Sequence, residues 1–250
     1  MPQAISRPFT VDFDASRTPR TLEVWVDFRT PVGEEAKISV LEIMTTFAAF
    51  GGRGGLAGSH INPGEANINL ETSQLGGTSG HWVFRDVLID PTSVCILLNM
   101  IHWAHLELVP VGKVHLAWPP GGLPSDPLAI QFPGLWPRLS FGLQIGDLLG
   151  DIDLDIELDQ PQTKEVNERI VEAMSMWLLA THRGAYADNS FDPAQSRVYL
   201  GPDLMNVKPG RIIWFIETLR CHDSALDGLF NLLEWAGQKI ARIRRVELGP

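Results

Sequence analysis

The chain has 250 residues, 44% of them hydrophobic and 20% charged, which is typical of a folded protein and excludes a disordered or collagen-like chain. Its net charge of −10 argues against a general nucleic-acid-binding protein, because phosphate recognition needs clustered lysine and arginine. The sequence has no apolar run of roughly 18 residues and no leader-like N-terminus, so we expect a cytoplasmic protein with no membrane partner.

The first half of the chain alternates between strand and helix patterns. Apolar and polar residues alternate in five segments that we predict to be strands: residues 9–14, 21–28, 66–70, 81–89 and 113–118. Apolar residues three and four positions apart predict a helix over residues 34–50, with an apolar face formed by Ile38, Leu41, Met44, Phe47 and Ala48. A second helix is expected to begin at Asp90, as its N-cap, and to reach about His105.

The second half repeats the first. Residues 22–63 recur in residues 151–193 at a shift of 130 positions, with the identical pairs Pro31/Pro161, Glu35/Glu165, Glu42/Glu172, Met44/Met174, Arg53/Arg183, Gly54/Gly184, Ala57/Ala187 and Pro63/Pro193. Later blocks match at a shift of 132, including Trp82/Trp214, Asn99/Asn231 and Trp103/Trp235. The repeat predicts strands at 151–159, 197–200, 211–219 and 239–248, and helices at 163–180 and 224–237. Ser224 and Asp227 resemble a capping box that opens the last helix.

This order of elements predicts an α+β fold of two tandem ferredoxin-like repeats. Each repeat should form an antiparallel sheet of strand order 4-1-3-2 with two helices on one face. We assign residues 1–118 to the first repeat, 119–150 to a proline-rich crossover and 151–250 to the second repeat. The crossover is too apolar for a flexible linker, so we expect it to pack on the repeats. Its predicted anchors are Leu135, Trp136, Leu139 and Phe141.

A glycine-rich stretch at residues 52–57 formally fits the pattern G-x-G-x-x-A. A dinucleotide-binding fingerprint opens a helix, whereas this stretch closes one, so we interpret it as a helix cap. Arg53 and Arg183 follow the first helix of each repeat and keep an Arg-Gly pair. Together with His182 they are possible ligand positions, although favourable charge at a helix C-terminus also explains them.

Two further groups of residues suggest chemistry. His102 and His105 lie one helical turn apart and, with Cys95, offer a metal site, but helix capping is the simpler interpretation and we predict no metal or cofactor. Cys95 and Cys221 do not form a Cys-x-x-Cys motif and should be reduced thiols. Four residues form a possible acid–base group: His182, Asp188, Asp192 and Asp203. Turn and cap roles also explain them, and we predict no catalytic residue.

Residues 151–159 form an unusually acidic strand. Strict alternation places five carboxylates on one face: Asp151, Asp153, Asp155, Glu157 and Asp159. Neighbouring carboxylates on that face, about 7 Å apart, repel one another and need cations nearby. We predict that these five residues bind a basic protein partner. The last strand offers the alternative, because Arg242 and Arg244 would make the ladder structural if they shared its face.

The predicted tandem arrangement resembles the architecture of chlorite dismutases, dye-decolorising peroxidases and some CRISPR repeat-processing endoribonucleases. Residues 224–228 are similar to the G-x-x-D-G motif of dye-decolorising peroxidases, without its first glycine. This resemblance implies an enzyme or ligand-binding protein with a pocket in one repeat, haem-dependent in the peroxidase case. The acidic balance, the broad sheet faces and the lack of a recognisable catalytic motif favour a different hypothesis. It is a non-enzymatic immunity or antitoxin-like protein that occludes a basic effector. A structural protein that assembles through an open sheet face is the third hypothesis.

Overall fold

The computed structural model describes residues 6–146, 148, 152–188 and 197–249. Within these residues the chain forms two five-stranded sheets and four α-helices, an α+β arrangement. The first half contains β1 (Thr10–Ala15), β2 (Leu22–Phe28), α1 (Glu34–Gly52), the short 3-10 helix η1 (Pro63–Glu65), β3 (Asn67–Gly76), β4 (Ser79–Leu88), α2 (Ser93–Glu107) and β5 (Val111–Trp118). The second half contains β6 (Gly142–Ile145), β7 (Ile152–Leu158), α3 (Lys164–His182), β8 (Arg197–Lys208), β9 (Arg211–Arg220), α4 (Ser224–Lys239) and β10 (Ile243–Gly249).

The strand order is β1-β5-β2-β4-β3 in the first sheet and β6-β10-β7-β9-β8 in the second. Without the outermost β1 and β6, both sheets have the predicted order 4-1-3-2 with antiparallel neighbours. β1 and β6 run parallel to β5 and β10. The sheets are therefore mixed, and the prediction of purely antiparallel sheets is wrong at this edge.

Strand β6 lies in the segment that we predicted to be only a crossover. Gly142 pairs with Arg245 just as Thr10 pairs with Lys113, at the shift of 132 positions that relates β5 to β10. Each edge strand follows a buried phenylalanine, Phe9 or Phe141. The similarity of the halves thus extends back to residue 141. The match was missed because β6 is only four residues long and begins with glycine.

The last part of the crossover packs on the second half, as its apolar composition indicated. Leu135 and Leu139 pack on the core. Asn231 of α4 accepts a hydrogen bond from the backbone N–H of Trp136, 2.7 Å away, and donates one to the carbonyl of Gly134. The predicted anchors therefore contact the protein, Trp136 through its backbone.

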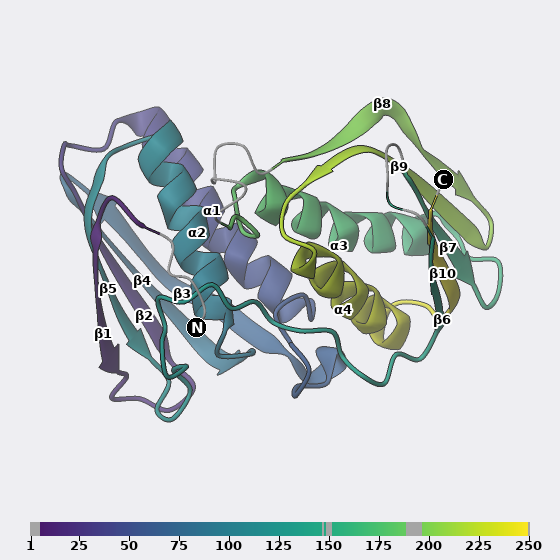
Figure 1. Cartoon of the computed structure of the whole chain (residues 1–250), viewed down its shortest axis with the longest axis horizontal. Coiled ribbons are helices and arrows are strands. Elements are labelled where there is room, and N and C mark those ends of the chain that lie inside the picture. The colour runs from purple at the N-terminus through teal and green to yellow at the C-terminus, as the bar shows by residue number, and fades with distance from the viewer. Residues whose placement is uncertain (1–5, 147, 149–151, 189–196, 250) are drawn as a thin grey trace.

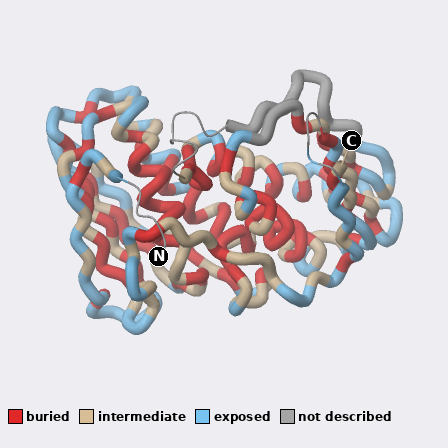
Figure 2. The backbone as a smooth tube through the Cα atoms, in the orientation of Figure 1, coloured by how far each residue is buried: buried red, intermediate tan, exposed pale blue. Residues whose placement is uncertain are grey.

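The four helices lie between the two sheets (Figure 1). α1 and α2 cover the inner face of the first sheet, and α3 and α4 cover that of the second, which gives the layers sheet, helices, helices, sheet. Buried residues follow the helices and the inner faces (Figure 2), and one hydrophobic cluster includes residues of both halves. No helix in the described part of the chain is long and apolar enough to cross a membrane. No helix of the described residues covers the outer face of either sheet.

Arg53 and Arg183 join the two halves. Arg53 Nη2 lies 2.5 Å from Glu172 Oε1, and Arg183 Nη2 lies 2.8 Å from Glu42 Oε2. Because both arginines and both glutamates are 130 positions apart, the two ion pairs are equivalent and relate α1 to α3 by a pseudo-twofold arrangement. Each arginine is followed by a glycine, and Gly54 and Gly184 have φ values of +81° and +72°. This left-handed conformation turns the chain at the end of each helix.

Several predicted helix features differ from the structure. Ile38 and Leu41 are 63% and 40% exposed, because the buried stripe of α1 runs through Val40 and Ile43 instead. The other three predicted positions, Met44, Phe47 and Ala48, are buried as expected. Helix α2 begins at Ser93, so Asp90 is not its N-cap as predicted. The Asp90 carboxylate instead accepts a hydrogen bond from the backbone N–H of Thr92, in the turn before the helix.

The capping box predicted at Ser224 is also wrong. Ser224 is the first residue of α4 rather than its N-cap, and its N–H donates to His222 Nδ1, 3.1 Å away. Strands β3 and β8 are longer than predicted because each continues as one arm of a hairpin with the strand that follows it.

Candidate functional site

A straight row of side-chain positions crosses the outer face of the first sheet. The alternation of β2 turns Glu23, Trp25 and Asp27 outward, while Val24 and Val26 are buried. The strand register then aligns one residue from each of the five strands: Asp12, His115, Trp25, His81 and Gln74. A half-buried tryptophan therefore stands at the centre of an open, polar sheet face.

Two imidazoles hold the Trp25 indole from either side. The His81 ring stacks on it with centroids 4.7 Å apart and planes 4° apart, and the His115 ring lies 4.9 Å away at 49°. Each histidine also faces a carboxylate. His81 Nε2 is 3.4 Å from Glu23 Oε2, and His115 Nε2 is 3.6 Å from Asp14 Oδ2. These contacts fix the orientation of the indole beside two acidic groups.

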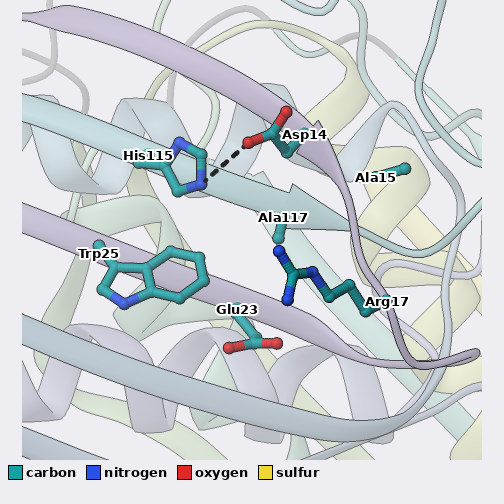
Figure 3. Close-up of a pocket in the computed structure, with 7 residues that line it drawn as sticks. All are labelled: Asp14, Ala15, Arg17, Glu23, Trp25, His115 and Ala117. Atoms are coloured by element: carbon teal, nitrogen blue, oxygen red, sulfur yellow. Dashed lines mark ion pairs between the residues drawn. The ribbon is translucent and has the colours of Figure 1, made fainter.

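A hollow opens next to this tryptophan, above the small side chain of Ala117 (Figure 3). Its walls include Asp14, Glu23, Trp25 and His115. Figure 3 shows Arg17 extending from the turn after β1 over Ala117 toward Glu23. Arg17 forms no ion pair with any described residue. The hollow thus combines an aromatic wall, two carboxylates and a guanidinium that none of them fixes.

The lysine on this face is already paired. Lys113 Nζ lies 2.6 Å from Asp12 Oδ2. Its hydrogen bond lowers the pKa of the Asp12 carboxyl and raises the pKa of Lys113. Lys113 therefore neutralises Asp12. Asp14 and Glu23 each face a histidine instead of a lysine or arginine.

The second sheet has a hollow at the equivalent position, with different chemistry. Asp155 replaces Trp25, while Glu247 and Ile213 replace the two histidines. Arg211 Nε donates to both oxygens of Asp155, at 2.8 and 3.0 Å. This hydrogen bond raises the pKa of Arg211. The second hollow therefore contains a guanidinium of its own chain, fixed on a carboxylate.

The predicted acidic ladder is mostly paired with arginines of the same sheet face. Asp155 has Arg211, Glu157 lies 3.0 and 3.4 Å from the nearest nitrogens of Arg244 and Arg245, and Asp159 lies 3.9 Å from Arg242. Asp153 has no ion pair with a described residue, and Asp151 lies outside the described residues. Because the arginines share the face of the carboxylates, the ladder is largely structural. Its role in binding a partner stays a prediction.

The other predicted site residues are not brought into one site. Arg53 and Arg183 make the ion pairs between the halves, and His182 is the exposed last residue of α3, so its ligand role stays a prediction. His105 Nδ1 accepts the N–H of Val111, 2.9 Å away, which ties α2 to β5. In the part of the chain that is described, no three His, Cys, Asp or Glu side chains could hold a metal ion, so the site suggested for Cys95 and the histidines is not formed.

The suggested acid–base group lies partly outside the structure's description. Asp192 is outside the described residues, as is the side chain of Asp203. His182 is exposed, and Asp188 is half-buried at the end of the described loop. The acid–base role of the four residues therefore stays a prediction.

Sequence reasoning missed the row around Trp25, although one signal was present. A tryptophan stood between Glu23 and Asp27 at positions whose alternation points away from the core. The flanking histidines come from β4 and β5, 56 and 90 positions later in the chain. Only the strand register brings them together.

No known protein family matches the sequence, and no curated protein is similar to it. Among solved structures, complex III2 from Candida albicans with bound Inz-5 is 10% identical, covers 96% of this chain and 77% of that chain, and has a TM-score of 0.21. Chlorite dismutase from Candidatus Nitrospira defluvii in complex with imidazole is 13% identical, with coverage of 92% and 90% and a TM-score of 0.20. A protease from Helicobacter pylori is 9% identical, with coverage of 93% and 79% and a TM-score of 0.22. TM-scores this low establish neither a shared fold nor a shared function.

Proposed function

We propose that this protein is a non-enzymatic, cytoplasmic binding protein of the immunity or antitoxin-like kind, which occludes a basic effector. The docking surface is the outer face of the first sheet, centred on Trp25. The proposed contact thus lies on the first half, whereas the acidic strand of the second half contributes at most through Asp153, which has no ion pair with a described residue.

One observation carries the proposal: the first sheet lacks the arginines that balance the second. Four arginines pair with the acidic ladder: Arg211, Arg242, Arg244 and Arg245. Their equivalents in the first half are Ser79, Pro110, Gly112 and Lys113, so a cation remains at one of the four positions, and it is paired with Asp12. Among the described residues, the Asp14 and Glu23 carboxylates beside Trp25 therefore have no arginine partner. A basic partner would supply the missing cations, and complementary charge of this kind accelerates association.

The aromatic centre of the face supports the same proposal. Binding energy in protein interfaces concentrates in a few residues, and tryptophan is among the most frequent of them. Trp25 is held in place by two ring contacts, so little side-chain entropy would be lost on binding. An ordered tryptophan surrounded by acidic residues fits a basic surface that excludes water.

We propose that each half is a ferredoxin-like repeat and that the chain arose by duplication. The shared strand order, the equivalent edge strands and the reciprocal ion pairs support it. After duplication, one outer face acquired arginines and the other acquired Trp25 and its histidines.

Capture from native lysate on the immobilised protein, followed by a salt titration, tests the proposed function. We expect a basic protein that elutes as salt rises, and we expect Trp25→Ala to abolish its capture. Asp153→Asn is the matched control on the other sheet and should retain the partner. Capture that is indifferent to both salt and Trp25→Ala would contradict the proposal.

A further inference from the structure

We propose that the hollow beside Trp25 is a guanidinium site that receives an arginine side chain of the basic partner. This inference rests on the proposed function and specifies the group that the docking face recognises. The site consists of the Asp14 and Glu23 carboxylates, the Trp25 indole and the floor at Ala117. Arg17 is its internal competitor.

The chemistry of the walls suits a guanidinium better than an ammonium. Guanidinium is planar, donates two parallel hydrogen bonds to a carboxylate and stacks on aromatic rings, whereas ammonium is a compact and strongly hydrated charge. Carboxylates and an indole line the same hollow here. An arginine can therefore use both kinds of contact at once, and lysine can use only the charge attraction well.

An arginine of the chain itself lines each of the two hollows. In the second sheet, Arg211 lies against Asp155 in the equivalent hollow. In the first sheet, the guanidinium of Arg17 already extends over Ala117 toward Glu23 without an ion pair (Figure 3). Arg17 is exposed and comes from a turn, so a better-placed arginine can displace it.

Each carboxylate of the hollow has an imidazole beside it, because His115 faces Asp14 and His81 faces Glu23. The nearby lysine, Lys113 on β5, is already paired with Asp12 on β1. An incoming guanidinium would therefore meet two carboxylates that are not paired with a lysine.

A titration of the full-length, 15N-labelled protein with N-acetyl-arginine amide tests the site. Two matched probes accompany it: N-acetyl-citrulline amide, which has the same shape without the charge, and N-acetyl-lysine amide, which has the charge without the planar group. We expect saturable NMR shifts at the Trp25 indole N–H and the Ala117 amide with arginine. The lysine probe should bind about threefold or more weakly, and the citrulline probe should cause no saturable shift.

Single substitutions test whether the arginine probe binds in the hollow beside Trp25. Glu23→Gln should weaken the arginine probe about tenfold, Asp153→Asn on the second sheet should leave it unchanged, and Arg17→Ala should tighten it by about threefold. The variant spectra also report whether each protein is folded. Equal shifts with citrulline, equal affinity for lysine, or shifts that survive Glu23→Gln would each overturn the guanidinium site.

The two proposals can fail separately. A basic partner that is lost with Trp25→Ala but competes with none of the three probes would overturn the guanidinium site and leave the docking face standing. Arginine binding at the hollow without any captured partner would support the site and contradict the proposed function.

Discussion

Trp25 and Asp155 occupy equivalent positions in the two halves of the chain, each at the centre of an outer sheet face. Trp25 lies between two imidazoles, and Asp155 is bound by Arg211. The equivalent strand position is thus aromatic in one half and part of an internal ion pair in the other. The second half has more carboxylates, but its own arginines neutralise most of those on its outer face. The carboxylates around Trp25 are therefore the ones that a basic partner can neutralise.

The reciprocal ion pairs between the halves should stabilise the fold unequally. The Arg183 side chain is 14% exposed and also bonds the carbonyl of Glu42, whereas the Arg53 side chain is 26% exposed. We expect the coupling between Glu42 and Arg183 to reach about 1 kcal/mol in a double-mutant cycle, and that between Glu172 and Arg53 to be smaller. Urea unfolding of Glu42→Gln, Arg183→Gln and the double variant measures it. A coupling of zero would show that the pair is incidental.

Tyr186 offers a test of packing in the second half. Its side chain is fully buried, and its hydroxyl has no hydrogen-bond partner among the described residues. Burial also raises the pKa of Tyr186 well above its ordinary value. Because an unpaired buried hydroxyl costs about 1 kcal/mol or more, Tyr186→Phe should leave the free energy of unfolding unchanged or raise it by about that amount. A loss of stability in Tyr186→Phe would reveal a hydrogen bond to this hydroxyl.

Gly228 faces that same hydroxyl, and a Cβ added there would lie 2.0 Å from it. Gly228→Ala should therefore destabilise the protein by about 1–3 kcal/mol. Adding Tyr186→Phe to Gly228→Ala should restore part of this loss, because the nearest ring atom is then 3.0 Å from the new Cβ. Additive effects of the two substitutions in denaturant unfolding would contradict this contact.

Asp227 should make stability depend on pH. Burial raises the pKa of its carboxyl, Asp223 raises it further and His222 opposes the shift. A carboxyl with a raised pKa binds more protons in the folded state, so its contribution to stability falls as pH rises from the unfolded pKa of about 3.9 to the folded value. Asp227→Asn should therefore raise the Tm near neutral pH and have little effect below about pH 3. Glu35→Gln, on the exposed first turn of α1, is the control. An increase of the same size at both pH values would contradict the sign of this shift.

The two thiols should be unreactive in the folded protein. Burial raises the pKa of Cys221 to about 12 and also raises the pKa of Cys95, although Arg7 partly offsets the latter. Thiolate is the reactive form, so iodoacetamide should label both cysteines slowly in buffer and rapidly in denaturant. Rapid labelling of the native protein would indicate that one thiol is accessible.

The sequence predicts the fold better than it predicts the site. The sequence matches at shifts of 130 and 132 positions and the alternation within the strands lead to the observed order of the four strands other than β1 and β6 in each sheet. β6 was missed because four residues beginning with glycine carry too little alternation. Ile38 and Leu41 were placed on the wrong face because α1 buries a neighbouring stripe of equally apolar residues.

The site depends on contacts between distant segments. Strict alternation correctly placed Asp153, Asp155 and Glu157 on one face, but only the strand register shows that arginines neutralise most of this ladder. The importance of Trp25 likewise follows from rings contributed by β4 and β5. Composition gives the total charge of a protein, whereas the folded sheet decides which charges stay unpaired.

The central claim is that a basic partner docks on the outer face of the first sheet. The most direct measurement is the affinity of the captured partner for the wild-type protein, Trp25→Ala and Asp153→Asn, determined by calorimetry at several salt concentrations. We predict that Trp25→Ala weakens binding by about 2 kcal/mol or more, that Asp153→Asn changes it by less than about 0.5 kcal/mol, and that wild-type affinity falls as salt rises. Wild-type affinity in Trp25→Ala, together with a large loss in Asp153→Asn, would place the partner on the second sheet and contradict this account.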